Sequence, residues 1–577
     1  MFRLRRFLKS YILQLIIGPI CKLTEAVLEL MIPLITADII DVGVIKNHDV
    51  GYVLSRGGLM VLMGALGLCF ALVCQKSASI ASQGFGTKLR NAMFRHINTL
   101  SHEEIDKLGT PSLITRMTND INQLQLAVAM LIRLVIRAPF LVIGAMVMAV
   151  MIDLKMSVIF FIASPLIALV LYIVMTSSVP FFKAMQNKLD RVSLISRENL
   201  SGNRVIRAFD KQDMEQERFD KANGELAETA LRVGRISALL NPVTYILAQA
   251  AIIAVVWIGA GFVDSGNLRT GQIVALVNYM TQILLAMIVV SNLVVIFTKA
   301  AASAARVNEV FDTKPSVTEQ TAKDIKTSDD SPAVEFKDVC FGYAGSGYAL
   351  KNISFTVDKG MTVGIIGGTG AGKSTLVNLI PRFYDVSEGQ VMVNGVDVRE
   401  YPFGQLRSGM GIVPQKAVLF SGTIRENMRW RKKDATDQEI EQALRISQSY
   451  EFVEKLPEKT DKIISADGKN LSGGQRQRLT IARALVGGPE ILILDDSASA
   501  LDFATDAALR KALKENTQGM TVFMVSQRIG TVRNADKILV IDNGELVGEG
   551  VHKQLVKNCP VYREICLSQL KAEEVDG

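Results

Sequence analysis

Residues 367–375 read GGTGAGKST, a spacing that could bind phosphate groups. The apolar run 362–366 precedes this segment and a helical stretch follows it, so the segment is predicted to join a strand to a helix. Glycines let backbone N–H groups approach phosphate oxygens, and the N-terminus of a helix adds positive potential. Lys373 could then reach the outer phosphates and Ser374 could ligate Mg²⁺. The alternative is a chance glycine-rich turn. The predicted phosphate-binding residues are Gly367, Gly368, Thr369, Gly370, Ala371, Gly372, Lys373, Ser374 and Thr375.

A second segment, residues 491–495, is an apolar run that ends in a carboxylate. In nucleotide-binding sheets such a strand, called Walker B, brings its terminal Asp to the metal at the carboxyl end of the strand. Asp495 is therefore a predicted Mg²⁺ ligand, with a helix N-cap as its alternative role. The two segments together predict a P-loop nucleotide-binding domain.

The stretch LSGGQ at 471–475, followed by RQR, resembles the signature sequence of ABC transporters, and this resemblance separates the chain from other P-loop NTPases. Small residues at a helix start are expected to leave the amides of Ser472, Gly473 and Gly474 free to approach phosphate. The family uses this segment against the nucleotide held by the opposite subunit, whereas a simple serine cap is the alternative. The predicted signature residues are Leu471, Ser472, Gly473, Gly474 and Gln475.

Further family markers follow in order along the chain. By resemblance, Tyr343 in FGY stacks on adenine, Gln415 in VPQ belongs to the Q-loop, and SALD, ending at Asp502, is the D-loop. The resemblance implies that ATP and Mg²⁺ are the cofactors. It also implies that Gln415 joins Ser374 and Asp495 as a metal ligand.

Three positions depart from the family pattern. Directly after Asp495 the family usually has Glu, which polarises the attacking water, but this chain has Asp496. Its carboxylate lies roughly 1.5 Å further back, and a misplaced general base loses much of a contribution of about 10²- to 10⁴-fold. Gln527 stands where the family usually has a switch His, and Ala466 stands where exporters commonly carry a Glu. Neutral drift could explain any one change.

The predicted catalytic positions, Asp496 and Gln527, both bear on the γ-phosphate, and two changes there favour a degenerate site. Because each ATP is sandwiched between one subunit's P-loop and the other's signature, an intact LSGGQ predicts a non-identical partner subunit. That half-transporter would supply the catalytic Glu and the switch His. A slow homodimeric exporter and a nucleotide-gated regulatory subunit without turnover of its own are the alternatives.

The bulk composition predicts a membrane protein. The chain has 577 residues, of which 49% are hydrophobic, and its mean hydropathy is +0.26, which exceeds the usual value for soluble proteins. Membrane spans need about 20 apolar residues each. Six such stretches lie at 15–40, 57–77, 131–152, 156–179, 238–262 and 273–297.

The predicted fold is a multidomain membrane protein. An all-α six-helix transmembrane domain of the ABC exporter, type IV-like fold occupies 1–312 and includes two long intracellular loops. A polar linker follows at 313–333. Short β-branched runs alternate with helical stretches over 334–577, as expected for an α/β P-loop domain. By resemblance, coupling helices lie near 111–120 and 201–209.

The charge pattern predicts orientation. A formal charge of +7 could indicate nucleic acid, but the basic residues concentrate in 78–130 and 180–236, whereas the predicted outer loops carry few Lys or Arg, such as Lys46, Lys155 and Arg269. This positive-inside bias predicts both termini in the cytoplasm, at the cell inner (plasma) membrane, and no nucleic-acid partner. The six cysteines show no CxxC spacing, so neither a zinc site nor a disulfide framework is expected.

Substrate class is only weakly indicated. Arg133 and Arg137 share one helix face at the start of the third span, where they either extend to the cytoplasmic surface or line a substrate cavity. We find no acidic cluster in the spans and expect a largely apolar cavity. The predicted partners are therefore membrane lipid and a small amphipathic substrate, either a drug or a lipid.

Overall fold

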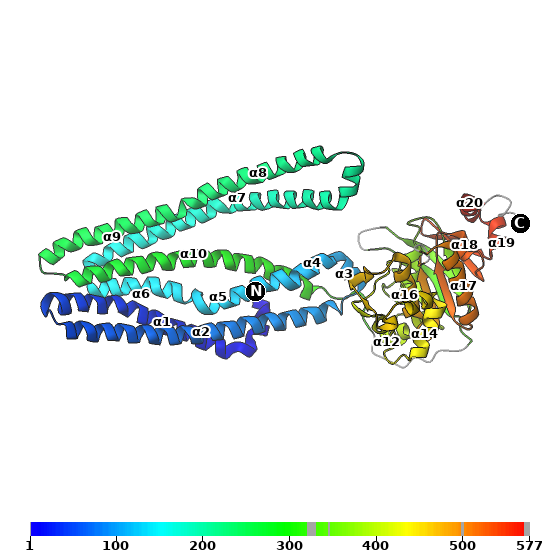
Figure 1. Cartoon of the computed structure of the whole chain (residues 1–577), viewed down its shortest axis with the longest axis horizontal. Coiled ribbons are helices and arrows are strands. Elements are labelled where there is room, and N and C mark those ends of the chain that lie inside the picture. The colour runs from blue at the N-terminus through cyan, green and yellow to red at the C-terminus, as the bar shows by residue number, and fades with distance from the viewer. Residues whose placement is uncertain (1, 320–329, 344–346, 498–500, 571–577) are drawn as a thin grey trace. The chain divides into compact units, whose positions relative to one another are not determined.

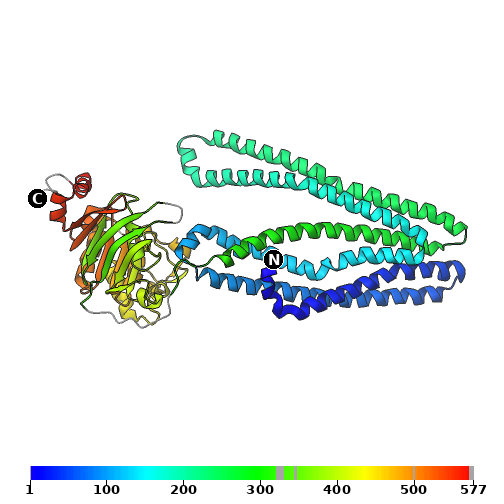
Figure 2. The same ribbon diagram turned by 180° about the vertical axis from the view of Figure 1, so that it is seen from behind.

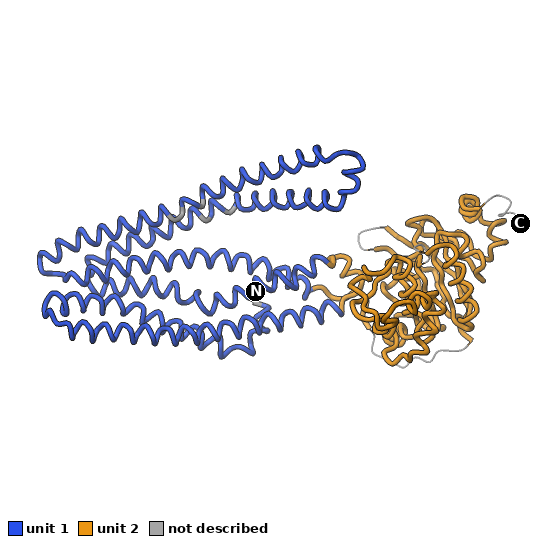
Figure 3. The backbone as a smooth tube through the Cα atoms, viewed as in Figure 1, with its two compact units in different colours: residues 1–98, 111–312 blue, residues 99–110, 313–577 orange. Residues whose placement is uncertain are grey.

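A computed structural model describes residues 2–319, 330–343, 347–497 and 501–570. The chain divides into two compact units, each with its own core (Figure 3). The first comprises Met1–Asn98 with Pro111–Asp312, and the second comprises Thr99–Thr110 with Thr313–Gly577. The short segment Thr99–Thr110 thus belongs structurally with the C-terminal part of the chain.

Long helices form the first unit (Figure 1). Side chains of Asp49 and Asp153 cap two of them, accepting hydrogen bonds from the N–H groups of Gly51 and Met156 at 2.8 Å each. The helical elements are η1 Phe2–Tyr11, α1 Ile12–Asp38, η2 Ile39–Lys46, α2 Val50–Ile97, α4 Thr110–Thr115, η3 Arg116–Asp120, α5 Ile121–Met130, η4 Leu131–Val135, α6 Arg137–Ile152, α7 Leu154–Ala208, α8 Gln212–Ala238, α9 Leu240–Asp264 and α10 Thr270–Asp312.

Five helices of the described residues are long and apolar enough to cross a membrane, and they overlap the second to sixth predicted spans. The first predicted span is also helical, within α1, but Lys22, Glu25 and Glu29 interrupt its apolar character. Each glutamate pairs with a cation, Glu25 with Lys22 and Glu29 with Arg137, so the two carboxylates do not contradict the expectation of no acidic cluster in the spans. Glu25 and Glu29 lie within the predicted span 15–40, where the apolar residues around them keep the average hydropathy high.

Small residues let the membrane helices pack closely. Ala26 on α1 and Ala275 on α10 are fully buried, and a Cβ atom on Gly144 of α6 would come within 2.4 Å of Leu30 Cδ1. The buried hydroxyl of Tyr279 donates a 2.6 Å hydrogen bond to the carbonyl oxygen of Leu30. This bond joins α10 to the middle of α1.

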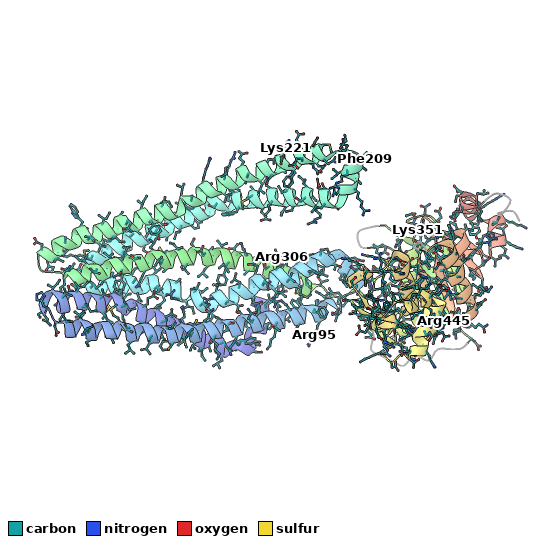
Figure 4. The ribbon with its side chains drawn as sticks, in the orientation of Figure 1. Arg95, Phe209, Lys221, Arg306, Lys351 and Arg445 are labelled. Atoms are coloured by element: carbon teal, nitrogen blue, oxygen red, sulfur yellow. The ribbon has the colours of Figure 1, made fainter. Side chains whose placement is uncertain are left out.

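An ion pair joins η3 to α10 within this unit. Asp120 accepts hydrogen bonds from Ser303 Oγ at 3.0 Å and Arg306 Nε at 2.8 Å, which join η3 to α10 (Figure 4). Helices α7 and α8 run side by side and meet at a turn near Phe209 (Figures 2 and 4). Phe209 is exposed at this turn, within the segment predicted as the second coupling helix.

The second unit is built on a mostly parallel sheet in the order β12-β11-β3-β10-β9-β6. Only β12 runs antiparallel to its neighbour. Every residue of β9 and β10 is buried, since helices cover both faces of such sheets. The strands are β3 Thr362–Ile366, β6 Met410–Val413, β9 Ile491–Asp495, β10 Thr521–Val525, β11 Lys537–Asp542 and β12 Glu545–Gly550.

A second, antiparallel sheet has the order β2-β1-β4-β5 and shares one apolar core with the first sheet. Its strands are β1 Val334–Phe341, β2 Leu350–Val357, β4 Glu388–Val393 and β5 Val396–Asp397, and a separate pair comprises β7 Gly422–Thr423 and β8 Ile463–Ile464. The helical elements of this unit are α3 His102–Leu108, α11 Lys373–Leu379, α12 Phe403–Ser408, α13 Ile424–Met428, α14 Asp437–Ile446, α15 Tyr450–Glu454, η5 Lys459–Asp461, η6 Ala466–Gly468, α16 Gly473–Leu485, α17 Phe503–Asn516, α18 Ile529–Val532, α19 His552–Asn558 and α20 Pro560–Gln569.

Helix α3 is part of the second unit, although about 200 residues separate it in sequence from the rest of that unit. Ser101 and Glu104 form a capping box at its start. The Ser101 hydroxyl accepts a 3.0 Å hydrogen bond from Val317 N–H, and Glu104 Oε1 accepts a 3.1 Å bond from Ser316 N–H. The residues that cap α3 therefore also hold the backbone at Ser316 and Val317, near the start of the C-terminal part of the second unit.

Aromatic contacts complete this packing. His102 stacks on Phe383 with ring centroids 4.5 Å apart, and the Tyr384 hydroxyl donates a 3.0 Å hydrogen bond to Asp106. We expected the first coupling helix near 111–120, but these residues belong to the membrane unit. The segment that packs within the second unit is α3, which comes before residues 111–120 in the chain. Its contacts are made by the capping box and by His102.

Candidate functional site

The loop between β3 and α11 adopts the conformation that its glycines allow. Gly370 and Gly372 have φ values of +80° and +104°, in the region that other residues avoid. A Cβ atom on Gly372 would also approach Ala349 O to 2.9 Å. Gly372 is therefore needed both for its backbone angle and for space where α11 begins.

Lys373 is directed back over this loop. Its side chain is buried, and Nζ donates hydrogen bonds of 3.0 Å to Gly367 O and 2.6 Å to Gly368 O. Burial lowers the pKa of Lys373, while the carboxylates of Asp496 and Asp495 oppose this effect. The ammonium group thus lies among the loop's backbone and two acidic side chains.

The proposed metal ligands also meet at this loop. Ser374 Oγ donates a 2.8 Å hydrogen bond to Asp495 Oδ1 at the end of the buried strand β9. Burial raises the pKa of Asp495, and the nearby carboxylate of Asp496 raises it further. The hydrogen bond from Ser374 and the charge of Lys373 act in the opposite direction and lower the pKa of Asp495. A hydroxyl and a carboxylate are hard oxygen donors, so this pair fits Mg²⁺.

A pocket of about 310 Å³ brings most of the predicted nucleotide-binding residues together. Gly367 and Gly368 do not line it; their carbonyl groups instead bind Lys373. The lining residues are Tyr343, Ala349, Thr369, Gly370, Ala371, Gly372, Lys373, Ser374, Thr375, Gln415, Asp495, Asp496, Val525 and Gln527.

Tyr343 lies at the edge of this pocket. Its hydroxyl is 3.1 Å from Thr375 Oγ1, and its ring packs edge-on against Tyr384, with centroids 5.4 Å apart. Tyr343 as a residue is 38% exposed, so its side chain is open enough for stacking. Residue types alone did not identify Tyr384 as the support for this ring.

Asp496 and Gln527 line the same pocket as the loop. Asp496 has φ +44°, and its N–H donates a 3.0 Å hydrogen bond to Val525 O, which fixes its backbone beside β10. Burial raises the pKa of Asp496, and a hydrogen bond with Gln415 lowers it. The shortened carboxylate therefore contacts the Q-loop side chain.

The segment that carries Gln527 is held by the C-terminal helix α20. Gln569 Nε2 donates a 2.7 Å hydrogen bond to Gln527 O, and Gln569 Oε1 accepts a 2.9 Å bond from Ile529 N–H. Gln569 could not be recognised from the sequence, since no local motif marks a glutamine that lies 42 residues further along the chain.

The signature segment begins α16. Ser472 caps this helix, and its own N–H donates a 2.9 Å hydrogen bond to Gln475 Oε1. The expectation of a free Ser472 amide was therefore wrong, because the capping box uses it. Ser472 and Gly473 are exposed, and none of Leu471, Ser472, Gly473, Gly474 or Gln475 lines the pocket around Lys373.

Asp502 is the N-cap of α17 and lies outside that pocket. Its carboxylate accepts hydrogen bonds from Thr505 N–H at 2.9 Å and Thr505 Oγ1 at 2.8 Å, and these bonds lower the pKa of Asp502. Of the other predicted D-loop residues, Leu501 is buried, whereas 499 and 500 lie outside the described residues.

The fold and the site define a P-loop nucleotide-binding domain joined to a helical membrane domain. Residues 15–287 match the family model of the ABC transporter transmembrane region, and residues 350–499 match the model described as ABC transporter. An uncharacterized ABC transporter ATP-binding protein of Mycobacterium tuberculosis is 36% identical, covering 100% of this chain and 99% of the relative. The chain therefore belongs to the ABC transporter family.

Two further comparisons agree with this family. A probable multidrug resistance ABC transporter ATP-binding/permease protein of Bacillus subtilis is 32% identical, covering 97% of this chain and 95% of the relative. The solved structure of a bacterial Atm1-family ABC exporter with ATP bound matches with a TM-score of 0.79 and 23% identity, covering 98% of this chain and 99% of that one. The fold is thus that of an ABC exporter, and the chain is a multi-pass membrane protein with an ATP-binding domain.

Proposed function

We propose that this chain is one subunit of a heterodimeric ABC exporter whose own ATP site binds nucleotide but hydrolyses it slowly. The observation that carries the proposal is the composition of the pocket around Lys373. Its walls include Asp496 and Gln527 at the positions where the family usually has Glu and His. The four histidines of the chain, His48, His96, His102 and His552, are not among its lining residues.

ATP binding would use the groups that already converge on this pocket. Backbone amides of residues 368–374 and the Lys373 ammonium would bind the phosphates, and the ring of Tyr343 would stack on adenine. Ser374, Asp495 and Gln415 would hold Mg²⁺, which neutralises phosphate charge when bound. The solved exporter relative is described with ATP bound, which supports this assignment.

Slow hydrolysis follows from what Asp496 and Gln527 can do. The Asp496 carboxylate is shorter than Glu by one methylene, and its hydrogen bond with Gln415 holds it beside the Q-loop. Gln527 can donate a hydrogen bond to a phosphate oxygen but cannot carry a positive charge. Both losses weaken the attack of water, so the rate should fall by about 10²-fold or more.

A partner subunit would complete the transporter. The exposed start of α16 offers Gly473 and Gly474 to a nucleotide held by another chain, as in the family arrangement. The partner would contribute the catalytic Glu and the switch His at that competent site. We retain the boundaries 1–312, 313–333 and 334–577 for the membrane domain, linker and nucleotide-binding domain.

The substrate class is supported by an apolar pocket of about 490 Å³ in the membrane unit. Its size lies within the range of pockets for small molecules. A multidrug resistance relative also favours an amphipathic substrate, either a drug or a lipid. We place the chain in the inner (plasma) membrane with both termini cytoplasmic. The pocket is lined by Pro139, Val142, Ile143, Ala168, Leu171, Tyr172, Thr176, Met287, Val290, Ser291 and Val294.

The test compares the purified chain alone with the chain co-expressed with a neighbouring half-transporter. ATP binding and phosphate release are measured for the natural chain and for the double variant Asp496→Glu/Gln527→His. Lys373→Ala is the control that should lose nucleotide. The lone natural chain should bind ATP with little turnover, and the double variant should hydrolyse it about 10²-fold faster or more.

Two outcomes would contradict the proposal. Rapid turnover by the unmodified lone chain would favour a homodimer with two equal sites. ATP binding that changes a partner without any uphill transport would favour a nucleotide-gated regulatory subunit instead.

A further inference from the structure

Five charged side chains gather inside the membrane unit, on α1 and on the η4–α6 helix. We call Lys22, Glu25, Glu29, Arg133 and Arg137 the intramembrane charge cluster. Its α1 members follow at intervals of three and four residues, so they share one face of that helix. Ionisable groups inside a membrane domain are costly and usually mark a functional site.

The cluster lies well below the outer ends of its helices. Glu29 is nine residues before the end of α1 at Asp38, which corresponds to about 13 Å along the helix. Arg137 is fifteen residues before the end of α6 at Ile152, or about 22 Å. Arg133 is nineteen residues before Ile152, or about 28 Å. Since the hydrocarbon core is about 30 Å thick, Glu29 and Arg137 lie within it and Arg133 lies at its inner edge.

Both carboxylates of the cluster already have cationic partners. Lys22 Nζ lies 2.6 Å from Glu25 Oε2, and the two side chains are only 17% and 18% exposed. Arg137 Nη2 lies 2.6 Å from Glu29 Oε2. The sequence left open whether Arg137 extends to the cytoplasmic surface or stays within the bundle. The ion pair shows that Arg137 contacts α1 within the bundle.

Arg133 is the cation left over. It is half-buried, and within the described parts of the chain it has no ion pair or hydrogen bond. A Cβ atom on Gly18 of α1 would come within 2.4 Å of Ile132 Cγ2, so η4, which carries Arg133, packs closely against the helix that carries Lys22 and Glu25. Three cations and two carboxylates leave the cluster with a net charge of +1.

Two further features indicate a ligand site. Arg133 belongs to the π-helical turn η4, and such turns within α-helices often occur at functional sites. Arg137 Nε is buried and has no hydrogen-bond partner among the described residues. A second guanidinium therefore has a free donor in the same cluster.

We propose that Arg133, assisted by Arg137, binds the anionic head group of the transported amphipathic molecule. A guanidinium presents paired N–H donors that match carboxylate, phosphate or sulfate oxygens. The inference deepens the proposed exporter function and rests on it. It narrows the substrate from any amphipathic compound to one with an apolar tail and a negative charge.

Equilibrium binding to the full chain in nanodiscs of neutral phosphatidylcholine tests this proposal. The probe is a fluorescent dodecyl phosphate, competed separately by phosphatidylglycerol, inorganic phosphate, dodecyl maltoside and dodecyltrimethylammonium. Arg133→Gln should weaken probe binding about 10- to 100-fold, as expected for the loss of a charge-assisted hydrogen bond. Arg133→Lys, which keeps the charge, should lose less, and Arg269→Gln in the predicted outer loop is the matched control.

The competitors separate the sources of the head group. Probe binding that phosphatidylglycerol does not displace supports a free amphipathic substrate, and displacement by phosphatidylglycerol supports a lipid. Inorganic phosphate should compete weakly because it lacks a tail, and dodecyl maltoside should compete weakly because it lacks a negative charge. The proposal would be overturned if the natural chain and Arg133→Gln bound the probe equally while thermal-unfolding curves showed that both are folded. Stronger competition by dodecyltrimethylammonium than by the anionic lipid would also overturn it. No ATP is hydrolysed in this assay, so failure of the degenerate-site proposal would leave its result unchanged.

Discussion

Gln569 on α20 offers a direct test of how the segment around Gln527 is positioned. Its amide makes both a 2.7 Å bond to Gln527 O and a 2.9 Å bond from Ile529 N–H. Ile529 is fully buried, so Gln569→Ala would leave a buried N–H group without its partner. Such a loss costs about 1–3 kcal/mol, which raises the population of the locally open segment about 5- to 150-fold.

Hydrogen exchange measured by mass spectrometry on residues 526–532 of the full chain would detect this opening. Gln569→Glu should have a smaller effect, since it keeps an acceptor for Ile529 N–H and loses only the donor to Gln527 O. Ser568→Ala is the matched control, because the Ser568 hydroxyl bonds only Ile565 O within α20. If Gln569→Ala exchanges at the natural rate, α20 does not hold this segment and the reasoning fails.

Three other perturbations have defined outcomes. Lys373→Ala should weaken ATP binding about 10- to 100-fold by removing a charged donor, as measured by equilibrium titration. Asp496→Glu and Gln527→His should show a coupling of about 0.5–3 kcal/mol in a double-mutant cycle of phosphate-release rates, because both line one pocket; simple additivity would contradict this. Burial and Arg407 lower the pKa of His102 from 6.5, against the effect of Asp106. The packing of α3 should therefore be strongest above pH 6.5 and weaken as the pH falls through the lowered pKa, since the unpacked His102 binds more protons. Hydrogen exchange of residues 99–110 should show this dependence in the natural chain and lose it in His102→Gln.

Local sequence was enough to locate the nucleotide pocket. The loop at 367–375 is contiguous, and a strand ending in Asp495 is recognisable from five residues. Parallel pairing of β9 with β10, and of β10 with β3, then brings these segments to one edge of the sheet. A strand-loop-helix pattern thus predicts where its functional groups lie, at the carboxyl end of the strand.

Contacts between distant segments could not be predicted in this way. Gln569, the packing of α3 and the Glu29–Arg137 pair each join residues that no short pattern relates. The predicted first coupling helix was misplaced for the same reason, since only tertiary packing distinguishes α3 from residues 111–120. The carboxylates of α1 were overlooked because average hydropathy hides isolated charges within an apolar stretch.

The proposed division of labour between two ATP sites has a thermodynamic basis. A ligand stabilises the state that binds it by an amount set by its concentration relative to its Kd, about 2.7 kcal/mol at a hundredfold excess. A site that binds ATP through Lys373 but hydrolyses it slowly would supply this stabilisation to the closed dimer through many turnovers. Hydrolysis at the partner's site would remove only the stabilisation that the partner's ATP gives to the closed dimer. The two nucleotide-binding domains could then reopen for transport without separating fully. Repairing Asp496 and Gln527 should therefore speed ATP hydrolysis and shorten the lifetime of the closed state together.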